Sequence, residues 1–116
     1  MPRVAGLDGE PAATDGLFAW EDGALSRARV TQCALSRVCG ACGRPLGRPV
    51  VFVGTVDEHA DNTFHAPPMH VECAERVRGL LGTGWEAART SGFEFVRPIT
   101  GDVDPRPRFQ PNSLLD

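Results

Sequence analysis

Two pairs of metal-ligating side chains constrain the fold of this chain more than any other feature. The stretch "CGAC" supplies Cys39 and Cys42, and "HVEC" supplies His70 and Cys73. Zinc in structural sites prefers four tetrahedral nitrogen and sulfur ligands. A CxxC turn brings two thiolates to one ion, and positions i and i+3 of a helix lie on the same face. The spacing therefore predicts one zinc ion held by all four residues. Because no coordination position stays open, we expect a structural ion and not a catalytic one.

Two other interpretations of the thiols stay open at this point. The cysteines can be buried, reduced thiols that pack as small hydrophobic side chains. A thioredoxin-like redox role for the CxxC pair would need a βαβ context, in which the HxxC pair has no part. Cys33 is expected to be a buried helix residue, with metal ligation as the alternative, and His65 to lie near a ligand or in a strand. The sequence leaves open whether either takes part near the metal.

The surrounding residues predict short elements of both kinds. We expect a helix over residues 23–36, with Asp22 as its N-cap. The β-branched and aromatic residues 49–56 predict a strand. A polar connection and a second short strand at "TFHAP" would complete a β-hairpin. The stretch "MHVECAERVRGLLG" predicts a helix with Gly82 as its C-cap, and the inner face of that helix is expected to include Leu80.

A zinc knuckle, a hairpin and a ligand-bearing helix together form a treble-clef arrangement. We therefore predict an α+β fold: a small single-zinc, treble-clef-like domain with an N-terminal helix and loop-rich tails. With 116 residues, one domain is expected. Residues 1–16 are predicted to be a flexible lead, residues 17–100 the zinc-binding domain, anchored by "LFAW", and residues 101–116 a loop-rich tail.

The pattern "CGAC…HVEC" resembles the first zinc module of LIM domains over about residues 39–75. LIM domains continue directly into a second zinc module, whereas this chain continues with "AERVRGLLG". With "PPMHVECA" included, the chain is also similar to small uncharacterised zinc-binding proteins of GC-rich bacteria and their phages. These resemblances imply a treble-clef fold and a zinc ion, and they carry no settled activity.

Charge separates the candidate functions. The net charge is −3, yet residues 23–56 contain five arginines and no acid. We expect a non-enzymatic adaptor or accessory protein that binds a protein partner. The alternative is a nucleic-acid-binding zinc finger that uses this arginine-rich segment, with contacts from Arg37, Arg44 and Arg48; the overall acidity disfavours it.

A third hypothesis is an HNH-like nuclease that uses His59, Asn62 and His70. It is disfavoured because His70 is already assigned to the zinc. The N-terminal stretch lacks the apolar core of a signal peptide, and no apolar run is long enough to span a bilayer. We therefore expect a cytoplasmic protein that does not bind membranes, with reduced thiols.

Overall fold

The N-terminal part of the fold is a short hairpin followed by a helix. The computed structural model describes residues 14–115. Strands β1 (Trp20–Glu21) and β2 (Ala24–Leu25) pair antiparallel, and helix α1 (Arg27–Ser36) follows. The predicted helix over 23–36 therefore begins too early. Asp22 is not its N-cap: Asp22 and Gly23 have φ of 53° and 83° and form the turn of the hairpin. Ser26 caps α1 instead, and its side chain accepts a hydrogen bond from the Arg29 amide.

The central sheet has three strands in the order β3-β4-β7. Strand β3 (Val50–Thr55) was predicted within 49–56 and is confirmed. It pairs antiparallel with β4 (Trp85–Thr90), which also pairs with β7 (Leu114–Leu115).

The predicted hairpin partner of β3 is wrong. Helix α2 (Val56–Asp61) begins where β3 ends, and a reciprocal capping box between Thr55 and Glu58 starts it. The segment "TFHAP" makes only one isolated bridge, from Phe64 to Phe109. The strand beside β3 comes instead from beyond the second ligand pair: β4 pairs with β3 from Val50 to Thr55, and α3 packs against both strands.

Helix α3 (Val71–Leu81) was predicted and is confirmed, including Gly82 as its C-cap. Ala74 and Val77 are buried against the sheet. The predicted inner face is too wide, because Leu80 is 43% exposed.

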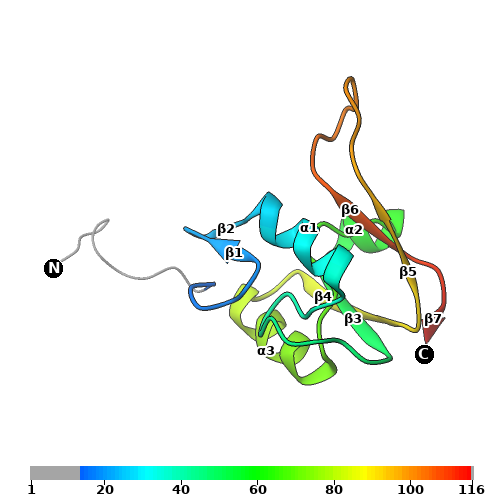
Figure 1. Ribbon diagram of the computed structural model, residues 1–116. Helices are drawn as coiled ribbons and strands as arrows, with labels where there is room; N and C mark the ends of the chain where they lie inside the picture. The colour runs from blue at the N-terminus through cyan, green and yellow to red at the C-terminus, as the bar shows by residue number, and fades with distance from the viewer. Residues whose placement is uncertain (1–13, 116) are drawn as a thin grey trace, which may run out of the picture.

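The end of the chain belongs to the folded body. Strand β5 (Phe93–Val96) pairs antiparallel with β6 (Arg108–Pro111), and Figure 1 shows the loop between them extending away from the rest of the molecule. Phe109 in β6 is fully buried. The boundary expected after residue 100 therefore does not coincide with the packing. At the other end, most of the predicted lead 1–16 lies outside the described residues, and the "LFAW" anchor does dock, since Leu17 is buried.

Two hydrophobic clusters form the core. The first, here called the metal-side cluster, includes Cys39, Val51, Met69 and Val77. The second, the phenylalanine cluster, is built around Phe52, Phe64 and Phe109 and also contains Val30 and Cys33 of α1. Neighbouring residues of β3 alternate between the two clusters, so this strand ties both halves of the core together. Within residues 14–115, no helix combines the length and apolar character needed to cross a membrane.

Candidate metal centre

The four predicted ligands converge. Cys39 and Cys42 lie in the loop after α1, and His70 and Cys73 lie at the beginning of α3. Their ligand atoms all fall within 4.8 Å of one another, so the group can hold one metal ion. Tetrahedral sulfur and nitrogen ligands about 2.0–2.3 Å from a zinc ion would be spaced by distances of this order. The prediction that two distant pairs form one cluster is confirmed.

Backbone hydrogen bonds fix the loop that carries the first pair. The Cys39 amide donates to the Arg44 carbonyl at 2.8 Å, and the Gly43 amide donates to the Cys39 carbonyl at 2.8 Å. Gly43 has a φ of +75°, which a residue with a side chain adopts only with strain. The Ala41 amide lies 3.4 Å from the Cys39 sulfur and donates to it. The loop therefore presents amide donors to sulfur, which stabilises thiolate charge.

His70 is held in the orientation that a metal ligand needs. It is the N-cap residue of α3, but its side chain makes no capping hydrogen bond. Its Nε2 lies 2.9 Å from the Pro45 carbonyl, to which it donates. That bond places the proton on Nε2 and leaves the Nδ1 lone pair free. Nδ1 lies 3.5 Å from the Cys42 sulfur and 3.8 Å from the Cys73 sulfur.

The thiols of Cys42 and Cys73 have different pKa values, because their hydrogen bonds and charged neighbours differ. Desolvation pushes the pKa of Cys42 up, but hydrogen bonds from the Arg44 amide and from neighbouring ligand side chains outweigh it and lower this pKa to about 7. Desolvation, followed by repulsion from Cys39 and Cys42, raises the pKa of Cys73 to about 12. A divalent cation among the sulfurs would offset that repulsion.

The other cysteine and the other histidines lie elsewhere. Cys33 is fully buried in α1, as predicted, and is not in the four-residue group; burial raises the pKa of its thiol to about 12. His65 contacts carboxylates instead of the ligands, with Nδ1 2.5 Å from Glu58 and Nε2 2.6 Å from Asp104.

The residues considered for a nuclease have structural partners. His59 lies in α2, its Nε2 donates to the Glu86 carbonyl at 2.9 Å, and its ring packs edge-on against Phe64. Asn62 ends α2 in a left-handed conformation and donates to the Pro111 carbonyl at 2.8 Å.

The arginines proposed as nucleic-acid or partner contacts, Arg37, Arg44 and Arg48, are all exposed. Arg44 and Arg48 lie in and just after the metal loop and form no ion pair within the described part of the chain. The Arg37 guanidinium lies 5.3 Å from the centre of the Phe93 ring. Arg29 of the same acid-free segment instead lies over Phe18, 4.8 Å from its centre.

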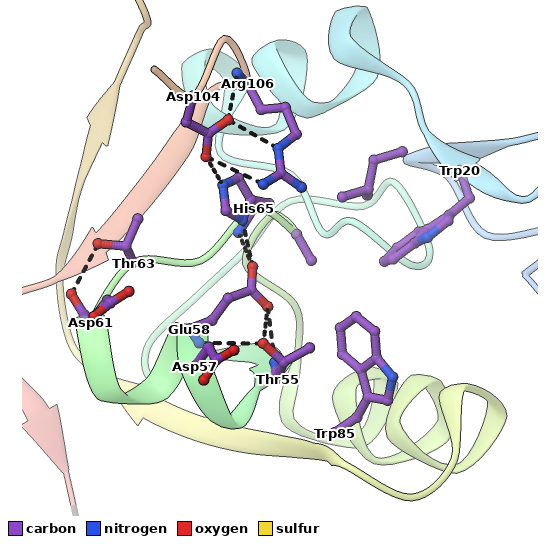
Figure 2. Close-up of a pocket in the computed structure, with 12 residues that line it drawn as sticks. Trp20, Thr55, Asp57, Glu58, Asp61, Thr63, His65, Trp85, Asp104 and Arg106 are labelled. Carbon is purple, nitrogen blue, oxygen red and sulfur yellow. Dashed lines mark hydrogen bonds and ion pairs between the residues drawn. The ribbon is translucent and has the colours of Figure 1, made fainter. Parts of the chain in front are cut away.

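Sequence reasoning missed a cleft with a volume of about 660 Å³. Figure 2 shows Trp20 and Trp85 on one side of it, with Glu58, His65 and Arg106 across from them. These residues come from five separate segments, so no local sequence pattern predicts the cleft.

Comparison of the chain with protein-family models, with curated proteins and with solved structures found no match. Three sulfurs and one imidazole nitrogen form a donor set suited to a borderline-soft ion such as zinc.

Proposed function

We propose that this is a non-enzymatic zinc-binding protein, in which one structural zinc ion stabilises a module that docks on another protein. The observation that carries the proposal is the orientation of His70. Its Nε2–H bond to the Pro45 carbonyl directs Nδ1 at the sulfurs of Cys42 and Cys73. A histidine held in this way by a carbonyl is characteristic of metal ligation.

The four ligands fill a tetrahedral shell, which supports a structural role for the ion. Cys39 is fully buried and belongs to the metal-side cluster together with Met69 and Val77. Losing the ion would therefore leave three sulfur groups beside the core that repel one another whenever they are charged. Structural zinc contributes on the order of 10 kcal/mol in zinc-finger peptides, which is comparable to the whole stability of a domain of this size.

The docking role is supported by the cleft beside Trp20 and Trp85, because tryptophan is enriched where proteins bind partners. Nucleic-acid binding remains the second candidate, and the exposed Arg44 and Arg48 near the metal loop favour it. The two roles place the partner on different surfaces, so variants at these residues separate them.

The metal part of the proposal is tested by elemental analysis of the purified chain and by its melting temperature before and after chelation. We expect a single zinc ion per chain and a large fall in melting temperature when zinc is removed. Cys73→Ser should lose zinc, whereas the matched control Cys33→Ala, which alters a buried thiol outside the cluster, should keep it. Full zinc occupancy in Cys73→Ser, or none in the unaltered protein, would contradict the proposal.

A further inference from the structure

The cleft that contains both tryptophans of the chain has walls of two kinds. Trp20 in β1 and Trp85 at the beginning of β4 are each half-buried, and both pack on the metal-side cluster. Figure 2 shows their indole rings bordering the open space of the cleft. We will call this space the tryptophan cleft. Its volume of about 660 Å³ lies within the range of ordinary ligand-binding sites.

The remaining walls carry an excess of negative charge. Four carboxylates line the cleft, against one guanidinium and one histidine: Asp57, Glu58, Asp61, Asp104, Arg106 and His65. Even with His65 protonated, negative groups outnumber positive groups by two. Arg106 is largely neutralised, because its Nε and Nη2 atoms lie 3.0 and 3.3 Å from the two oxygens of Asp104.

Hydrogen bonds hold the polar wall in place. Glu58 bonds through Oε1 to the Thr55 amide, at 2.9 Å, and through Oε2 to the His65 amide and ring. The other nitrogen of His65 contacts Asp104. The wall is therefore built before any ligand arrives, which lowers the entropic cost of binding.

Two carboxylates of this wall are available to attract a cation. Asp57 and Asp61 lie on α2, both are exposed, and neither forms an ion pair within residues 14–115. An exposed carboxylate near an aromatic wall attracts a cation, and indole rings bind cations over their faces more strongly than other aromatic rings do. The excess of negative charge disfavours a phosphate or a nucleic acid in the same space.

We propose that the tryptophan cleft binds a guanidinium or ammonium side chain of a basic peptide segment, with the indoles of Trp20 and Trp85 against the cation and Asp57 and Asp61 attracting it. This inference rests on the proposed docking function and names the chemistry of the partner. It also separates the partner surface from the exposed arginines near the metal loop.

The composition of the chain supplies a direct readout. The protein has two tryptophans and no tyrosine, and both tryptophans line the cleft. Titration of the zinc-loaded full chain with a hexa-arginine peptide, followed by tryptophan emission, should give a saturable change that weakens as salt is added. A hexa-glutamate peptide should give none. A saturable response to hexa-glutamate, or tighter binding of a single-stranded oligonucleotide, would overturn the proposal.

Charge variants test the polar side of the cleft. The double variant Asp57→Asn, Asp61→Asn should weaken hexa-arginine binding about fivefold. The double variant Glu75→Gln, Glu94→Gln, which removes two exposed acids outside the cleft, should leave it unchanged. Equal weakening in both variants would show that only overall charge matters and would refute a specific site.

Aromatic variants test the other side, with a labelled peptide and fluorescence anisotropy. Trp85→Leu should weaken binding about tenfold, and Trp85→Phe by less; unchanged affinity in Trp85→Leu would refute the cation–π contact. Zinc content and melting temperature are measured on every variant. A protein that keeps its zinc and its fold but does not bind the peptide would overturn this inference alone, whereas a protein without zinc would overturn the proposed function.

Discussion

Replacing Phe109 with alanine should be among the most damaging single changes in the molecule. Phe109 is fully buried, and its ring centre lies 5.1–5.7 Å from those of Phe52, Phe93 and Phe95. Truncating a buried phenylalanine to alanine costs about 3–5 kcal/mol. Because the variant also loses three ring contacts, we expect a loss of unfolding free energy in the upper half of that range, at about 4–5 kcal/mol. A protein of 116 residues has a total stability of about 6–17 kcal/mol, so the variant loses a large share of it.

Urea unfolding of the zinc-loaded protein, followed by tryptophan emission, measures this loss. The variant should unfold at a lower midpoint concentration of urea than the unaltered protein. Val103→Ala is the matched control, because Val103 lies fully exposed in the loop before β6 and its truncation should change stability by less than about 0.5 kcal/mol. A cost below about 1 kcal/mol for Phe109→Ala would refute the reasoning, because it would show that β6 does not complete the core in solution.

Two more outcomes follow from the packing around the metal loop and from the charges of the cleft. Gly40→Ala should cost about 1–3 kcal/mol and weaken zinc binding, because the new Cβ would lie 2.5 Å from Pro67 Cγ, whereas Gly47→Ala, with open space around it, should do neither; melting temperature and zinc affinity measure both, and equal effects at the two glycines would contradict this. The Arg106 guanidinium, with a smaller contribution from His65, holds the pKa of Asp104 well below its usual range. The stabilisation from Asp104 is therefore present above about pH 4 and is lost as the pH falls through and below that value. Unfolding free energy should fall less steeply with acid in Asp104→Asn than in the unaltered protein, and identical pH profiles would argue against the contact.

The metal cluster could be predicted because its geometry is local. Within each ligand pair, the two-residue spacer fixes how the two side chains lie relative to each other. The fold then needs only to bring the two pairs together. Helix α3 was predictable for a similar reason, because the helical spacing of its buried residues and the glycine at its end are both local features of the sequence.

Some errors had a readable cause. Asp22 and Gly23 form an Asp-Gly dipeptide, which favours a two-residue hairpin turn over a helix cap. Helix α2 follows Thr55 and Glu58, a T-x-x-E pattern typical of a capping box. In both places a short-range turn or cap pattern decided the structure, and the wider hydrophobic pattern did not.

The pairing of distant strands could not be predicted from the chain alone. Strand β3 pairs with β4, from beyond the second ligand pair, and β6 packs Phe109 beneath Phe52. These contacts depend on burial that only the assembled core provides. The same holds for the tryptophan cleft, whose two indoles lie 65 positions apart in the printed sequence.

The late position of β6 also bears on how the chain folds during synthesis. All four metal ligands have been synthesised once residue 73 is added. The backbone of Phe64, in contrast, forms its hydrogen bonds with Phe109, which is synthesised much later. A nascent chain can therefore take up its ion well before the phenylalanine rings are covered. Until the ribosome has passed β6, those rings are the part of the protein most exposed to aggregation and to chaperones.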